Sequence, residues 1–192
     1  LDGVSVSIAG RPAFVYYISP TQINVQAPSE IAVQSSGTPV EVRVSSPDGA
    51  AVSSTRVTPV APALFTYPLA GEIHAAAVHP DGVLVGPGGA IPGTTTRAAR
   101  SGEIVLLYAT GIGLNTDPSV PAGFMPANAA AVKDPLEVTI GGLAARIIYA
   151  GLVSPGLYQL NVVVPTLETR AQSVKIRMSG VESEGQVLLM VQ

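Results

Sequence analysis

Two stretches of this chain share one residue pattern: VSVSIAGRPAFVYYISPTQINVQAP at 4–28 and LEVTIGGLAARIIYAGLVSPGLYQLNVVVP at 136–165. Eight positions of the first stretch recur in the second: Ile8/Ile140, Gly10/Gly142, Ala13/Ala145, Ser19/Ser154, Pro20/Pro155, Gln22/Gln159, Asn24/Asn161 and Pro28/Pro165. The second stretch holds five more residues between its Ile and its Gln. Self-similarity of this kind predicts one supersecondary plan that is used twice.

Short apolar–polar alternation dominates both stretches and the segments that follow them. It is present at 4–8 and 40–45, and it returns at 136–140 and 174–178. A two-residue period predicts strands with one buried face, as in antiparallel sheets. Between two such strands, Pro47-Asp48-Gly49 has the residues of a tight turn. The chain is therefore predicted to be all-β.

Composition narrows the classes of function. The 192 residues include 20 Gly, 17 Pro and no Cys, and the net charge is −3. There is no basic stripe to neutralise phosphates and no apolar run of about 18 residues, so we expect neither nucleic-acid binding nor membrane insertion. The absence of Cys excludes disulfides, thiolate metal sites and cysteine nucleophiles. We expect no cofactor and no metal.

Six residues are candidates for ligand contact: Tyr16, Tyr17, Gln22, Asn24, Gln159 and Asn161. The recurring Gln and Asn either hydrogen-bond across strands or into a neighbouring turn, which we favour, or form a polar ligand face. The adjacent tyrosines could stack on sugars, although packing in the core or at its rim is favoured. The apolar patch Ala63-Leu64-Phe65 is expected to pack between domains, with a docking surface as the alternative.

The two histidines, His74 and His79, are five residues apart and would point to opposite faces of a strand. We expect them at the surface or in turns, where they could share a metal ion only through a bend. A Ser-His-Asp triad would need one of them, and no Gly-x-Ser-x-Gly motif is present. No catalytic residue is assigned.

Three motifs carry a resemblance to known proteins: SPTQIN at 19–24, YATGIG at 108–113, and YAG at 149–151 followed by YQLN at 158–161. The order of Gly-x-x-Ala at 10–13, SPTQINV at 19–25 and the alternating valines before Pro-Asp-Gly at 47–49 resembles the later half of an IPT/TIG immunoglobulin-like domain. Residues 101–111 are similar to the opening strand and glycine turn of that domain. Nearly the whole chain is similar to an uncharacterised C-terminal domain family of large secreted acidobacterial proteins. The resemblance implies an immunoglobulin-like fold and export, and it transfers no activity.

With this resemblance, we expect two tandem immunoglobulin-like β-sandwich units. Residues 1–60 would form a partial unit that lacks its N-terminal strands, and residues 101–192 a second sandwich. Residues 61–100 are predicted to be a linker with short strands and a Gly/Pro-rich loop at 86–93. A sandwich without an edge strand exposes unpaired backbone, so we expect either a dimer through this sheet or an internal patch from residues 72–85.

The expected function is that of a non-catalytic structural or interaction module at the C-terminus of an exported or cell-surface bacterial protein. Its partners would be the upstream domains of the same polypeptide and a protein or polysaccharide. A carbohydrate-binding or adhesion module is the alternative, and a hydrolase is less favoured. Because a fold does not determine a function, these expectations rest on the resemblance and on the residues present.

Overall fold

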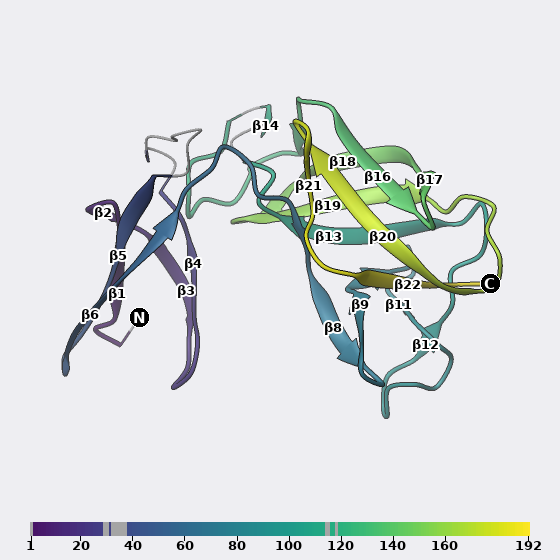
Figure 1. Ribbon diagram of the computed structural model, residues 1–192, viewed down its shortest axis with the longest axis horizontal. Coiled ribbons are helices and arrows are strands. Elements are labelled where there is room, and N and C mark those ends of the chain that lie inside the picture. The colour runs from purple at the N-terminus through teal and green to yellow at the C-terminus, as the bar shows by residue number, and fades with distance from the viewer. Residues whose placement is uncertain (1, 29–30, 32–37, 114–115, 118) are drawn as a thin grey trace.

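The computed structural model describes residues 2–28, 31, 38–113, 116–117 and 119–192, and every regular element in them is a β-strand. The chain forms two units, a smaller N-terminal one and a larger C-terminal one (Figure 1). The predicted all-β fold with immunoglobulin-like sandwich units is confirmed. Within the described residues, no helix is long and apolar enough to cross a membrane.

The first unit packs a four-stranded sheet against a separate two-stranded hairpin (Figure 1). The sheet has the order β2-β1-β5-β6 and consists of β1 (Ser5–Ile8), β2 (Arg11–Pro12), β5 (Pro39–Ser46) and β6 (Gly49–Arg56). The hairpin consists of β3 (Phe14–Ile18) and β4 (Ile23–Gln26). Ser46 pairs with Gly49, so the turn predicted from Pro47-Asp48-Gly49 is present.

The core of the first unit is small and half open. Three apolar residues are buried in it, Val6, Ile8 and Ile31. The residues packed around them are only partly buried: Ala13, Val15, Ile23, Val25, Val40, Val42, Val44 and Val57. The alternation in the sequence thus places these side chains on the inner face, but much of that face remains in contact with water.

The second unit is a sandwich of two larger sheets (Figure 1). One has the order β12-β11-β10-β13-β19-β18-β15-β14, with β7 also beside β13: β7 (Ala63–Leu64), β10 (Ala77–Val78), β11 (Leu84–Val85), β12 (Thr96–Arg97), β13 (Ile104–Thr110), β14 (Thr116–Asp117), β15 (Ala130–Val132), β18 (Arg146–Ser154) and β19 (Leu157–Val163). The other has the order β17-β16-β20-β22-β9-β8, with β21 also beside β20: β8 (Thr66–Leu69), β9 (Glu72–Ala75), β16 (Leu136–Ile140), β17 (Leu143–Ala144), β20 (Arg170–Met178), β21 (Val181–Glu182) and β22 (Val187–Val191).

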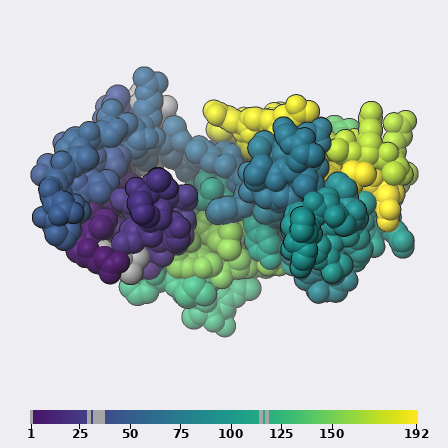
Figure 2. All heavy atoms as spheres, turned by 90° about the horizontal axis from the view of Figure 1, so that it is seen from below, coloured from purple at the N-terminus to yellow at the C-terminus, as the bar shows by residue number. Residues whose placement is uncertain are grey.

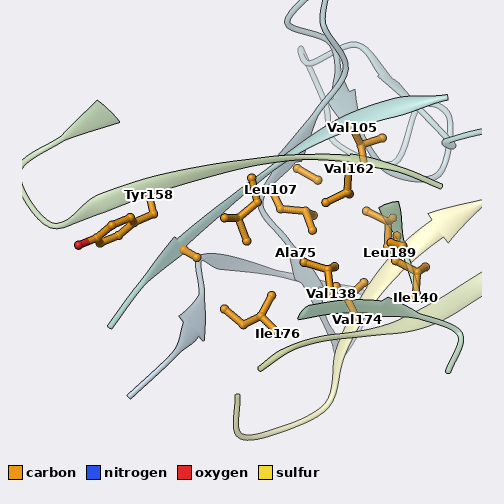
Figure 3. Close-up of a cluster of buried hydrophobic side chains, with 14 of the residues drawn as sticks. Ala75, Val105, Leu107, Val138, Ile140, Tyr158, Val162, Val174, Ile176 and Leu189 are labelled. Carbon is orange, nitrogen blue, oxygen red and sulfur yellow. The ribbon is translucent and has the colours of Figure 1, made fainter. Parts of the chain in front are cut away.

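The core of the second unit lies between these sheets and is closed (Figure 3). β13 and β19 contribute side chains from one sheet, and β16, β20 and β22 contribute them from the other. The residues concerned are at most 2% exposed: Val105, Leu107, Leu160, Val162, Val138, Ile140, Val174, Ile176 and Leu189. Alternate residues of each strand supply this core, as the two-residue period requires.

Residues 61–100 differ from the linker that was expected. They form six short strands, of which β8 and β9 join one sheet of the second unit and β7, β10, β11 and β12 join the other. Ala75, Ala77 and Val85 are buried in its core. The segment therefore belongs to the second sandwich, and residues 72–85 do not patch the first. Short strands were expected here, but strands of two to four residues show too little periodicity to indicate the sheets that they join.

Two short strands of the segment between β13 and β16 also contribute to a sheet. β14 and β15 pair with one another, and β15 pairs with β18. Residues 114, 115 and 118 of this segment lie outside the described residues. Residues 119–129 have no regular structure, and Gly123 among them contacts the first unit.

The two recurring stretches form similar hairpins, with an extra residue at the same place. The pairs on either side of it are Val15–Val25 and Tyr17–Asn24 in β3–β4, and Ile147–Val162 and Tyr149–Asn161 in β18–β19. Tyr16 and Ile148 are therefore the unpaired residues at this place, and β18 has a second unpaired residue, Val153, nearer its end. A bulge of this kind changes which face the following side chains occupy.

The difference between the two cores predicts unequal costs of truncation at corresponding positions. Leu160 is 0% exposed, whereas Ile23 is half-buried. We expect Leu160→Ala to lower the free energy of unfolding by about 3 kcal/mol and Ile23→Ala by about 1 kcal/mol. Urea denaturation followed by circular dichroism measures both. Equal losses would contradict the half-open core of the first unit.

Candidate functional site

Loops of the second unit dock against the hairpin of the first. The backbone N–H of Gly123 donates a hydrogen bond of 2.7 Å to Oε1 of Gln26. A Cβ atom on Gly123 would lie 2.7 Å from the ring of Phe14, and the φ angle of this residue is +83°. Glycine is therefore required at 123 both for its conformation and for the close approach of the backbone. Figure 2 shows the purple N-terminal strands against the green residues of the second unit.

The docked units enclose a cleft of about 730 Å³. The hairpin contributes Phe14, Tyr16 and Asn24. The second unit contributes aromatic and aliphatic side chains together with Ser154: Phe65, Ala76, Tyr108, Met125, Ser154, Pro155 and Leu157. A concave site of this size, with mostly apolar walls and a few polar groups, has the features of ligand and peptide sites. We take it as the candidate functional site.

Of the six candidate residues from the sequence, the structure places two in the lining of the cleft. Tyr16 and Asn24 both line the cleft, while Tyr17, Gln22, Gln159 and Asn161 are not part of its lining. Tyr17 is 47% exposed and Tyr16 is 49% exposed, so exposure alone does not distinguish the adjacent tyrosines. The two tyrosines are distinguished by the packing of the second unit against the hairpin, which places only Tyr16 in the wall of the cleft.

The recurring amides make the same hydrogen bond in both units. Nε2 of Gln22 donates to Oδ1 of Asn24 over 2.6 Å, and Nε2 of Gln159 donates to Oδ1 of Asn161 over 2.8 Å. These bonds run along one strand, between residues two apart, rather than across strands or into a turn. They support a structural role for the recurring residues, although Asn24 also faces the cleft.

Sequence reasoning missed most of the cleft because its walls come from distant segments. Phe65 was assigned to packing between domains, and it lines the cleft while 40% exposed. Phe14 and Met125 were not singled out. The only signal for Met125 was a pair of large apolar residues, Phe124 and Met125, in a segment rich in Pro and Ala, and they are 65% and 64% exposed.

Both histidines are buried, which contradicts the expected surface positions, and only His79 lies at a turn. His74 is 3% exposed in β9, between β8 and β22, and its ring stacks on Tyr67 at 5.8 Å. His79 is 1% exposed, at the start of the turn after β10. Neighbouring strands cover these rings, which a local pattern cannot reveal. Neither histidine lines the cleft.

His79 belongs to a cluster of charged groups in the second unit. Its Nε2 lies 3.2 Å from the carbonyl oxygen of Arg97, and its Nδ1 lies 3.6 Å from Oε2 of Glu103. Nη1 of Arg97 donates to both carboxylate oxygens of Glu103 at 3.2 Å, and Nη2 donates to Asp81 at 3.4 Å. The cluster links β12, the turn after β10 and the start of β13. Among the described residues, no group of three or more His, Asp or Glu is arranged to hold a metal ion.

The hydrogen bonds in this cluster favour the ionised carboxylates. Burial acts to raise the pKa of Glu103, but the N–H of Arg100 and the guanidinium of Arg97 outweigh it, so the pKa lies below its ordinary value. The N–H of Val83 and the Arg97 guanidinium lower the pKa of Asp81. The cluster therefore stabilises the fold when both carboxylates are charged.

This arrangement predicts a loss of stability in acid. Because the pKa of Glu103 is lower in the folded than in the unfolded chain, its contribution is present above the ordinary value of 4.5 and is lost as the pH falls through the folded pKa. We expect Glu103→Gln to lower the free energy of unfolding by about 1–2 kcal/mol at neutral pH. The difference in stability between the unmodified chain and this variant should shrink as the pH falls below 4.5, the ordinary pKa of glutamate. The exposed Glu184→Gln is the control. A pH-independent difference in urea denaturation would refute this assignment.

The docking contact predicts a second, separable effect. Gly123 and Gly142 both have positive φ angles, but a Cβ on Gly142 would meet nothing within 4 Å. Gly123→Ala and Gly142→Ala should therefore share a conformational cost of about 1 kcal/mol, while only Gly123→Ala should displace Phe14 and loosen the docking. Small-angle X-ray scattering should show a larger radius of gyration for Gly123→Ala alone. The same radius for both variants would rule out this role of Gly123.

Comparisons with known proteins do not assign a function to the cleft. No model of a protein family matches the chain, and no curated protein matches it either. The lining of the cleft and the docking contacts are therefore the observations on which a function can be built.

Proposed function

We propose that this chain is a non-catalytic structural and interaction module, and that it binds a partner in the cleft between its two units. The observation that carries this proposal is the lining of the cleft, where aromatic and aliphatic side chains from both units surround two polar groups, Asn24 and Ser154. Walls of this kind hold an apolar or amphipathic segment by burial, and a few hydrogen bonds orient it.

The setting of the module follows from the resemblance noted in the sequence. It would lie at the C-terminal end of an exported or cell-surface bacterial protein, with the upstream domains of that polypeptide as its first partners. The similar hairpins β3–β4 and β18–β19 support two copies of one IPT/TIG-like plan. The contact between Gln26 and Gly123 supports a fixed spacing between them. A module of this kind would space or anchor the domains before it.

A carbohydrate-binding or adhesion module is the second candidate. Tyr16 and Tyr108 both line the cleft, and aromatic rings beside a side-chain amide such as that of Asn24 suit stacking and hydrogen bonding to a sugar. A hydrolase has less support, because His74 and His79 are buried and neither reaches the cleft.

One pair of variants tests the cleft. Tyr16→Ala should weaken binding of a cleft ligand about tenfold, because the ring forms part of the wall. Tyr17→Ala removes an adjacent ring of similar exposure outside the cleft and should have no effect. A peptide array and a glycan array, each probed with the unmodified chain and both variants, measure this.

The two arrays separate the candidates. Peptide binding that depends on Tyr16 and not on Tyr17 supports the interaction module, and glycan binding with the same dependence supports the carbohydrate-binding alternative. Binding that is unchanged by Tyr16→Ala shows that the cleft is not the site.

A further inference from the structure

Corresponding core positions of the two units differ in burial. Leu160 and Val162 on β19 are 0% exposed, whereas Ile23 and Val25 on β4 are half-buried. The opposite sheets differ in the same way. Val174 and Ile176 on β20 are 0% exposed, and the residues at the corresponding registers of β5, Val42 and Val44, are half-buried. The first unit thus has the inner face of a sandwich but lacks part of its cover.

The strand that provides this cover in the second unit is β13. It pairs with β19 on the edge that faces away from β18, with Val105 opposite Val162 and Leu107 opposite Leu160. Its inward side chains Val105, Leu107 and Ala109 are 0% exposed. In the first unit, the sheet that contains β4 has β3 as its only other strand among the described residues. The edge of β4 that corresponds to the β13 side of β19 is therefore unpaired there.

A hollow of about 340 Å³ lies beside this edge, between the two units. On one side its lining includes Val25, Ile31 and Val57 of the first core, and on the other it includes Gly111, Pro155 and Tyr158 of the second unit.

The four-stranded sheet ends at β2 and β6, and both edges are different. β2 consists of two exposed residues, Arg11 and Pro12. All eight residues of β6 are exposed, and four of them are Ser53, Ser54, Thr55 and Arg56. Unlike β2 and β6, the edge of β4 is one where an added strand would bury apolar side chains on both partners.

We propose that the edge of β4 binds an extended segment of another polypeptide, with aliphatic side chains at alternate positions in the pattern of Ile104–Thr110. The segment lies antiparallel to β4, in the register that β13 takes on β19. Two aliphatic side chains, opposite Ile23 and Val25, enter the core, and backbone hydrogen bonds extend the two-stranded sheet. Addition of a strand to an exposed edge is a recurrent mode of peptide recognition. The hollow beside β4 shares Tyr16, Pro155 and Gly156 with the aromatic cleft. The edge is therefore tested by hydrogen exchange in β4 and by a variant of Val25, which does not line the cleft.

The probe is a synthetic peptide with the sequence of residues 103–111, EIVLLYATG, extended by two lysines for solubility and labelled with a fluorophore. The matched control peptide carries V105N and L107N, which place polar groups at the two inward positions. Fluorescence anisotropy with the full chain measures binding, and hydrogen–deuterium exchange locates it. We expect saturable binding of one peptide per chain, slower exchange in β4, and at least about tenfold weaker binding of the control.

Two further variants make the result specific. Val25→Lys should abolish binding, with circular dichroism as the check that the chain still folds. Val52→Lys on the edge of β6 should leave it intact. A peptide N-methylated at alternate residues removes the pairing donors without changing the protein, and it should also fail to bind. The proposal is overturned if the unmodified peptide does not bind, if protection appears at β6 instead, or if analytical ultracentrifugation shows that a second copy of the chain already pairs at β4.

Discussion

Each hairpin of the recurring kind needs a third strand on its outer edge before its aliphatic side chains leave water. In the second unit, β13 fills that position, and its backbone pairs with β19 over six residue pairs. The two strands together bring Leu107 and Leu160 into a core that the opposite sheet closes (Figure 3). Burial of such side chains contributes about 1.5–3 kcal/mol each. The larger unit can therefore stand on its own core.

The first unit has a similar hairpin but no counterpart of β13 among its described residues. Its β5–β6 ribbon and its hairpin still form, because turn residues and alternation act locally. Its core, however, contains three buried residues surrounded by half-exposed ones. Contact with the second unit compensates in part, since Phe14 and Gln26 pack against Gly123. The aromatic cleft is a consequence of this docking, because the walls belong to different units.

The short strands of residues 61–100 complete the second unit, although their sequence resembles that of a linker. The segment from β7 to β12 adds strands to both sheets of the second sandwich, and the cluster of His79, Arg97 and Glu103 ties its far end to β13. The guanidinium of Arg97 is hydrogen-bonded to Glu103, whereas the buried Nδ1 of His79 lies 3.6 Å from that carboxylate and has no hydrogen-bond partner among the described residues. A region with the composition of a connector thus completes the larger core.

The sequence by itself determined the local structure: the all-β class, the turn at Pro47-Asp48-Gly49, and the strands whose apolar side chains alternate. These follow from two-residue periodicity and turn chemistry, which depend on neighbours in the chain. It also indicated Tyr16 and Asn24 but could not separate them from Tyr17 and Gln22. Only the tertiary structure decided which residues form the cleft, that residues 61–100 belong to the second unit, and that the histidines are buried. Each of these depends on which distant strands lie side by side, and short strands of similar composition carry too little local information to specify that pairing.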